Sequence, residues 1–145
     1  PSGVPMDLRK DAPYGIYSKF QFTAAVRQNG DCWDRYMVRR DEIAESCSIL
    51  DQALEGLVAG EIMGKVPKAN LRPPAGESYA QLEGARGVLG VYIVSDGGLS
   101  PYRLHLRAPS FINLAMLQDM LKGWKVADVV AILGSIDIVL GEVDR

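Results

Sequence analysis

The chain has 145 residues, with 16 basic and 18 acidic side chains, a net charge of −2 and 48% hydrophobic residues. These values are ordinary for one globular domain and exclude disordered, collagen-like and coiled-coil proteins. The balanced charge, without a run of Lys and Arg, gives no electrostatic signal for binding nucleic acid. Two cysteines, Cys32 and Cys47, are too few for a disulfide scaffold.

Residues 1–28 carry three prolines interleaved with Tyr and Phe and show no sustained hydrophobic period. We predict an extended arm that lies across other structure and is loosely held. The chain begins with neither a Met nor the apolar stretch of a signal peptide. We therefore expect residues 1–145 to be a single segment of a longer chain.

A long helix is predicted over residues 31–58. Asn29-Gly30 is a turn signal, Asp31 is a candidate N-cap, and Asp34 stands where a capping box places an acid. Apolar residues then recur at helical spacing, which predicts a stripe along one face, with Cys47 as a small core residue. The stripe consists of Tyr36, Ile43, Cys47, Leu50, Leu54 and Leu57.

The charges on this helix are segregated. Arg35, Arg39 and Arg40 precede all the acids from residue 41 onward, which is the opposite of the order that the helix dipole favours. Two interpretations stay open at this point. The charges form a solvated face, or the arginines bind a partner or form internal ion pairs.

Residues 61–77 are rich in Pro and Gly and predict a connecting loop, and alternating residues over 78–107 predict antiparallel strands. The strands are expected at 78–84, 87–95 and 101–107, because Val, Ile and Tyr are frequent there and turn residues separate them. His105 is the only histidine and has no second His or Cys at ligand spacing. We interpret it as a polar-face residue rather than a metal ligand.

Residues 110–145 predict C-terminal helices, with Pro109-Ser110 as the cap of the first and Gly123 as its end. Its inward stripe is expected to be Leu114, Leu117 and Leu121. A second helix is predicted over 126–133, bent or broken by Gly134-Ser135. We expect the C-terminal helix to be packed inside a helical core. The fold class is therefore α+β and mainly helical.

The C-terminal segment is the place where chemistry is most plausible. Asp137, Glu142, Asp144 and Arg145 stand among apolar neighbours, so they must be paired or must face a polar cavity. The uncharged run between Asp128 and Asp137 has only eight residues, too few to span a membrane. Motifs for nucleotide phosphates, zinc proteases and α/β-hydrolases are missing from the sequence, as is Cys-x-x-Cys.

Five segments span the chain in order: SGVPMDLRKDAPY at 2–14, GDCWDRYMVRRDE at 30–42, GVLGVYIVSDG at 87–97, PYRLHLRAPSFINL at 101–114 and ADVVAILGSIDIVLGEVDR at 127–145. Together they resemble the C-terminal part of one family, the large, hydrogenase-related, quinone-site subunit of NADH-quinone oxidoreductase, respiratory complex I. This family is similar to the large subunit of nickel–iron hydrogenases, so the resemblance implies a hydrogenase-like fold.

Hydrogenase large subunits end in a motif of the form DPCxxCxxH, in which the two cysteines bind the metals. Laid on residues 137–145, the cysteine positions become Val139 and Glu142, and the final His becomes Arg145. Nickel sites of this kind need thiolate ligands, which Val and Glu do not supply. We therefore expect no nickel and no other metal at this site.

The resemblance implies that a quinone-headgroup cavity replaces the metal pocket. Val139 and Leu140 would line its apolar wall, Glu142, Asp144 and Arg145 would form a charge network, and Asp137 would be a buried link in proton coupling. The family's quinone-binding His and Tyr lie in an amino-terminal half that this segment does not include, so the segment by itself is expected to be inactive.

The resemblance also implies partners and a location. Electrons from NADH would reach quinone through flavin and iron–sulfur clusters held by other subunits, coupled to proton translocation. The neighbours would be the iron–sulfur subunit and the membrane subunit, on the cytoplasmic side of the inner (plasma) membrane. Arg35, Arg39, Arg103 and Arg107 match recurring arginines of the family. They would tune an iron–sulfur cluster or an interface, or else pair internally with Glu42, Glu83 or Asp96.

Two alternatives to this function stay open. One is a non-catalytic, hydrogenase-like scaffold or interaction module. The other is a subunit of a related energy-converting oxidoreductase with a different electron donor.

Overall fold

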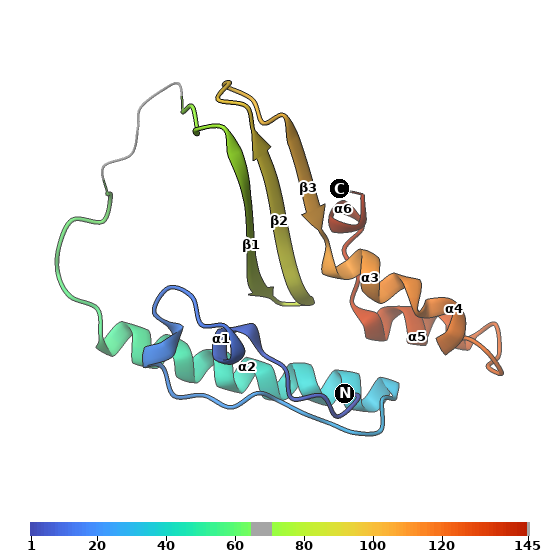
Figure 1. Cartoon of the computed structure of the whole chain (residues 1–145). Helices are drawn as coiled ribbons and strands as arrows, with labels where there is room; N and C mark the ends of the chain where they lie inside the picture. Colours follow the sequence, from blue (N-terminus) through green and yellow to red (C-terminus); the bar gives the residue numbers. More distant parts are fainter. Residues whose placement is uncertain (65–70, 145) are drawn as a thin grey trace.

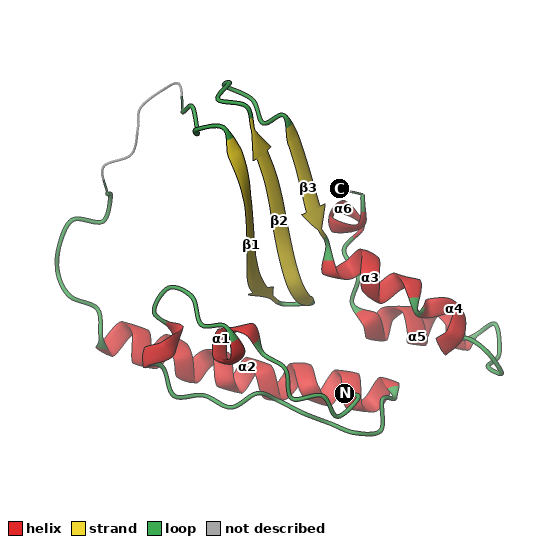
Figure 2. Ribbon diagram, in the orientation of Figure 1, coloured by secondary structure: helices red, strands yellow, loops and turns green. Residues whose placement is uncertain are grey.

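The structure is a computed structural model that describes residues 1–64 and 71–144. Helices and a small antiparallel sheet follow one another along the chain, which confirms the mixed fold class (Figures 1 and 2). The helices are α1 (Leu8–Asp11), the 3-10 turn η1 (Tyr17–Lys19), α2 (Cys32–Glu55), α3 (Pro109–Ala115), α4 (Leu117–Met120), α5 (Asp128–Ile136) and α6 (Leu140–Val143). The strands are β1 (Gly76–Gly84), β2 (Gly87–Ser95) and β3 (Arg103–Arg107).

Helix α2 begins where the capping residues indicate. The Asp31 carboxylate accepts a hydrogen bond from the Asp34 amide at 2.7 Å, which satisfies one free amide of the first turn. The Asp34 carboxylate does not complete a capping box, because it accepts from the Asn29 amide instead, at 2.7 Å. Gly56 caps the other end, so the helix is slightly shorter than the predicted range.

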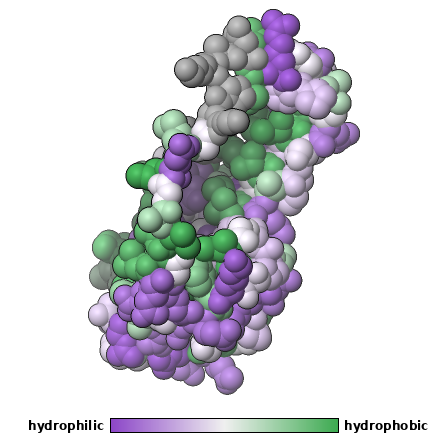
Figure 3. Space-filling model, turned by 90° about the vertical axis from the view of Figure 1, so that its left-hand side faces the viewer, coloured by the Kyte–Doolittle hydropathy of each residue, from purple (hydrophilic) through white to green (hydrophobic). Residues whose placement is uncertain are grey.

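The apolar stripe of α2 does not form a core among the described residues. Its members are mostly exposed, with Leu54 at 68%, and Cys47 is exposed as well. The buried positions of α2 are Asp34, Val38 and Ile49 instead. The predicted core role of the stripe and of Cys47 is therefore wrong for this chain. Figure 3 shows apolar surface, coloured green, open on the outside of the molecule.

The N-terminal arm runs along α2 (Figure 1) and is held by hydrogen bonds at several points. Gln21 and Gln52 exchange two bonds, the Thr23 amide donates to Glu45 at 2.8 Å, and Arg27 pairs with Asp41 at 2.5 Å. Leu8 and Phe22 are buried. The expectation of a loosely held arm is wrong, because side chains of α2 supply partners for its otherwise unpaired backbone.

The sheet has the strand order β1-β2-β3, with both pairs antiparallel. Strands β1 and β2 are joined by a two-residue turn, Ala85-Arg86, between the paired Gly84 and Gly87. His105 lies opposite Tyr92 and is exposed, as its position on the polar face predicts.

The C-terminal helices differ from the prediction at three points. The first predicted helix does not run to Gly123 but is divided at Met116 into α3 and α4, and α4 ends at Met120. Helix α3 is capped by Ala108 with Pro109 in its first turn, so Ser110 lies inside the helix and is not its cap. Helix α5 runs through Gly134-Ser135 without a break and ends at Asp137, which adopts a left-handed conformation.

Few apolar side chains are buried in the described residues. They are Leu8, Phe22, Val38, Ile49, Ala108, Ile132 and Ile136. Helix α6 lies against α3 (Figure 1), and Leu140 remains 73% exposed. The C-terminal helix is therefore not enclosed in a helical core, contrary to expectation. Among the described residues, none of the helices combines the length and the apolar character needed to span a bilayer.

Candidate functional site

The site is centred on residues 134–139, which comprise the end of α5 and the link from it to α6 and which we call the C-terminal turn. At its apex Asp137 has φ 58° and ψ 50°, the one positive φ at a non-glycine residue in the described chain. Asp tolerates this left-handed conformation better than most residues, but surrounding contacts must hold it there. The contacts of Asp137 therefore determine the conformation of the turn and the direction of its side chains.

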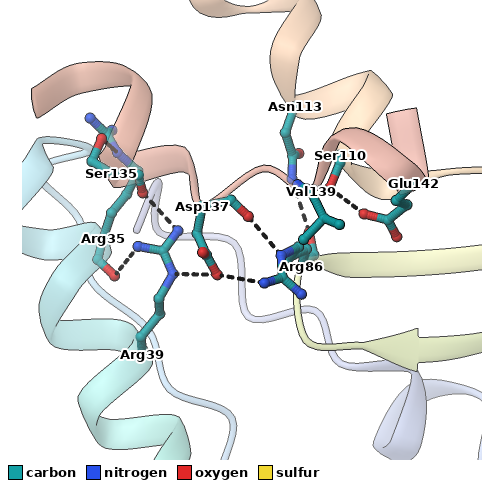
Figure 4. Close-up of polar contacts among 9 residues, drawn as sticks. All are labelled: Arg35, Arg39, Arg86, Ser110, Asn113, Ser135, Asp137, Val139 and Glu142. Carbon is teal, nitrogen blue, oxygen red and sulfur yellow. Dashed lines mark hydrogen bonds and ion pairs between the residues drawn. The ribbon is translucent and has the colours of Figure 1, made fainter. Parts of the chain in front are cut away.

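Two arginines of α2 reach the C-terminal turn from one side (Figure 4). Arg35 and Arg39 are four residues apart, so they lie on the same face of the helix. Arg35 Nε donates to Ser135 Oγ at 2.9 Å, and Arg39 Nη2 donates to the Ser135 carbonyl at 2.7 Å. Arg39 Nε lies 3.9 Å from the Asp137 carboxylate. These contacts join α2 to the end of α5.

Arg86 reaches Asp137 from the opposite side (Figure 4). Its Nε donates to the Asp137 carbonyl at 2.7 Å, and its Nη2 lies 3.3 Å from the Asp137 carboxylate. Arg86 is not among the site residues predicted from the sequence. The available signal was its place in the two-residue turn between Gly84 and Gly87, which fixes its position closely.

Glu142 and Val139 belong to a second cluster, on α6 and just before it. The Glu142 carboxylate is hydrogen-bonded by the hydroxyl of Ser110, a side chain that is only 1% exposed. The same hydroxyl accepts from the Val139 amide at 3.4 Å. Ser110 thus connects α3 to the start and the middle of α6, and it is also missing from the predicted site residues.

The remaining predicted site residues are not gathered into this network. Leu140 and Asp144 are exposed, and Arg145 lies outside the described residues. The Asp137 side chain is 46% exposed, so it is not the buried link that was expected. In the described part of the chain, Glu142 bonds to Ser110, whereas the contacts expected between Glu142, Asp144 and Arg145 depend on a residue outside it.

The four predicted arginines lie in two different places. Arg35 and Arg39 bind the C-terminal turn, whereas Arg103 and Arg107 are exposed on β3. Arg107 donates to the Val88 carbonyl at 2.8 Å, and neither β3 arginine forms an ion pair within the described ranges. Pairing with Glu42, Glu83 or Asp96 is therefore wrong. Of these four arginines, Arg39 forms an ion pair, and its partner is Asp137.

A polar cavity of about 420 Å³ adjoins Asp137, between the arm, α2 and the β1-β2 turn. Its charged lining includes Arg9, Arg39, Glu42 and Glu83. Burial raises the pKa of Glu42 above its usual value, and the like charge of Glu83 adds to this, although Arg9 and Arg39 oppose it. The cavity therefore holds one carboxyl whose pKa lies above the usual value for Glu.

The described residues contain no cluster of three or more His, Cys, Asp or Glu side chains suited to a metal ion. What they do contain is a polar site: a carboxylate between two guanidinium groups, and beside it a buried hydroxyl bonded to a second carboxylate. Such groups can bind and orient a polar ligand or hold a proton.

Comparison with known proteins gives consistent results. The chain matches the family described as "Respiratory-chain NADH dehydrogenase, 49 Kd subunit" over residues 1–73 and 64–145. It is 57% identical over 144 residues to the D subunit of the NADH-quinone oxidoreductase of Dehalococcoides mccartyi, covering 99% of this chain and 39% of the relative. It is 52% identical over 143 residues to the corresponding protein of Desulforamulus reducens, with the same coverage.

A solved structure is also similar. It is reported as the structure of the membrane-bound sulfane sulfur reductase, an archaeal respiratory membrane complex. One of its chains is 40% identical to this one with a TM-score of 0.88, over 99% of this chain and 40% of that one. The chain thus spans about two fifths of the relatives it matches. Matched along its whole length, the chain belongs to the family of the 49 Kd subunit of respiratory-chain NADH dehydrogenase.

Proposed function

We propose that this chain forms part of the wall of a quinone-headgroup cavity in an NADH-quinone oxidoreductase. The observation that carries the proposal is the organisation of the C-terminal turn. Three arginines from α2 and the β1-β2 turn hold residues 134–139, and Ser110 holds Glu142 beside them. So many contacts on one short turn support a role for its side chains beyond packing these residues against the rest of the fold.

The chemistry of the turn suits a quinone. Reduction of a quinone by two electrons takes up two protons, so the cavity needs groups that hold protons and an apolar surface for the ring. Val139 and Leu140 supply exposed apolar surface next to Asp137 and Glu142. Val139 and Glu142 carry no thiolate, and the proposal includes a hydrogenase-like fold in which no nickel is held at these positions.

The rest of the enzyme would be supplied by other polypeptides and by other parts of the same one. The named relatives are about two and a half times as long as this chain, which covers 39% of them. We propose that flavin and iron–sulfur clusters lie on partner subunits and that an iron–sulfur subunit and a membrane subunit adjoin this one. The complex would lie at the inner membrane, with this subunit peripheral on the cytoplasmic side and electron transfer coupled to proton translocation.

The variant Glu142→Gln in the assembled complex tests the proposal. Gln keeps the size and one hydrogen bond to Ser110 but removes the charge, so we expect slower reduction of a short-chain quinone or a raised KM for it. The matched control is Glu61→Gln, at an exposed position that is distant from Glu142 in the sequence. Unchanged turnover together with unchanged quinone affinity in Glu142→Gln would remove Glu142 from the cavity.

A second candidate function is favoured by the structural similarity to a sulfane sulfur reductase at 40% identity. A related respiratory complex with a different electron donor or acceptor would use the same fold. Assays of the purified complex with quinone and with polysulfide as acceptors separate the two candidates. Activity with neither acceptor would instead favour a non-catalytic scaffold.

A further inference from the structure

We propose that Arg86 is a positioning residue, which fixes the orientation of the Asp137 carboxylate from the β1-β2 turn. This inference rests on the proposed function, because it assigns a residue that acts through Asp137 in the quinone cavity. It goes beyond that function by adding a residue from a distant part of the chain, 51 positions away.

Arg86 controls both the backbone and the side chain of Asp137. Its Nε bonds the Asp137 carbonyl at 2.7 Å while its Nη2 faces the carboxylate at 3.3 Å. The two donors belong to one rigid, planar guanidinium group, so the direction of the carboxylate is set relative to its own backbone. Asp137 needs such support because a left-handed backbone at a non-glycine residue is strained.

Arg86 is itself held in place before it meets Asp137. Its carbonyl accepts a hydrogen bond from Asn113 Nδ2 on α3 at 2.9 Å. Gly87, which follows it, has φ +127°, and a Cβ there would lie 3.3 Å from the Cβ of Pro109. The turn is therefore pressed against the start of α3, and Arg86 extends from a fixed base.

Arg39 does not duplicate this role. Its Nη2 binds the Ser135 carbonyl, and its Nε is 3.9 Å from the Asp137 carboxylate, beyond a hydrogen bond. Arg39 thus holds the end of α5, whereas Arg86 contacts Asp137 twice. Because the Asp137 side chain is 46% exposed, the ion pairs add little stability, and orientation is the larger effect.

The test is a double-mutant cycle in the assembled complex, with a short-chain quinone as acceptor. The variants are Arg86→Met, Asp137→Asn and the two combined. Arg40→Met is the control, because Arg40 is exposed and, among the described residues, pairs with Asp41 alone. We expect Arg86→Met to lower kcat about tenfold or more, with a smaller change in KM. The double variant should be no slower than Asp137→Asn, because Arg86 acts through that carboxylate.

Two further variants guard against a folding defect. Arg86→Lys keeps the charge but not the double contact, so it should recover little of the lost kcat. Asn113→Leu removes the side-chain bond to the Arg86 carbonyl. We expect it to lower kcat by less than Arg86→Met does. When Asp137→Asn is already present, adding Asn113→Leu should lower kcat no further. If the complex with Arg86→Met does not assemble, the double-mutant cycle is measured with Asn113→Leu and Asp137→Asn instead.

The outcomes separate this inference from the proposed function. Normal kcat in Arg86→Met, full recovery in Arg86→Lys, or losses that multiply in the double variant would each overturn the positioning role alone. Full activity in Asp137→Asn would instead remove Asp137 from the proposed chemistry, and the positioning role with it.

Discussion

The role of a single residue can change when a helix begins one or two positions away from the predicted start. Ser110 follows Pro109, and that pair predicts a helix cap, but the proline occupies the first helical turn and Ala108 becomes the cap. The Ser110 hydroxyl is then free to bind Glu142, 32 residues away. Asp31 was assigned correctly because its partner, the Asp34 amide, is local. Local partners can be predicted from spacing, whereas distant ones cannot.

Asp7 also has a local partner, Arg9, and gives a pH-dependent prediction. It is 6% exposed and accepts hydrogen bonds from the amide, Nε and Nη2 of Arg9. Burial opposes ionisation, but these bonds outweigh it and lower the pKa of Asp7 below its usual value. A carboxyl with a lowered pKa in the folded state adds stability above its unfolded pKa and loses it as the pH falls through the folded value.

We therefore expect Asp7→Asn to weaken the arm by about 1–3 kcal/mol at pH 7, because three donors lose a charged partner. Hydrogen exchange of residues 7–12, corrected for the intrinsic rate, should be faster in the variant. The difference should begin to shrink below about pH 4, where the Asp7 carboxyl of the opened arm becomes protonated, and should go on shrinking as the pH falls through the lower pKa of the folded state. Asp119→Asn, at an exposed position, is the control. A difference that persists unchanged at pH 2 to 3 would contradict the assignment.

At the scale of elements, the existence of α2 and of the three strands followed from periodicity and turn residues. The direction in which α2 faces did not. Its most regular apolar stripe is exposed, while Asp34, Val38 and Ile49 are buried. Periodicity identifies an apolar face but not the structure that packs on it. Helix α5 likewise continued through Gly134-Ser135, because a glycine within a helix costs only about 1 kcal/mol and packing can offset it.

The start of α2 provides a prediction at this scale. Asp31→Ala removes the side chain that caps the first turn, so we expect a loss of about 1 kcal/mol in the free energy of unfolding. Denaturant unfolding followed by circular dichroism measures it. Asp51→Ala is the control, since Asp51 is exposed in the interior of the same helix and Ala favours helix there. Equal effects of the two substitutions would show that the cap is not used.

For the whole molecule, the described residues leave much apolar surface open. Only seven hydrophobic residues are buried among them, whereas side chains such as Tyr36, Ile43 and Leu54 are more than half exposed. Monomeric proteins rarely expose large continuous apolar patches. The composition gave no warning of this, because a 48% hydrophobic chain is equally consistent with a well-filled core.

We expect the 145-residue chain, expressed by itself, to bind a hydrophobic dye strongly and to associate as its concentration rises. Dye fluorescence and size-exclusion chromatography over a range of concentrations measure both effects. The substitution Leu54→Lys, at an exposed position of α2, should reduce both without loss of helix content. A monomer that does not bind the dye would contradict this expectation.

The sequence by itself determined the mixed fold class, the long helix, the hairpins and the family, because these depend on local propensity, spacing and segment identity. The tertiary structure decided which charges meet. Within the described residues, Asp137 pairs with Arg39 and Arg86, and Glu142 bonds to Ser110, and none of these contacts was predicted. Side chains 30 to 100 positions apart are joined only when helices and turns pack, and spacing along one chain does not record that packing.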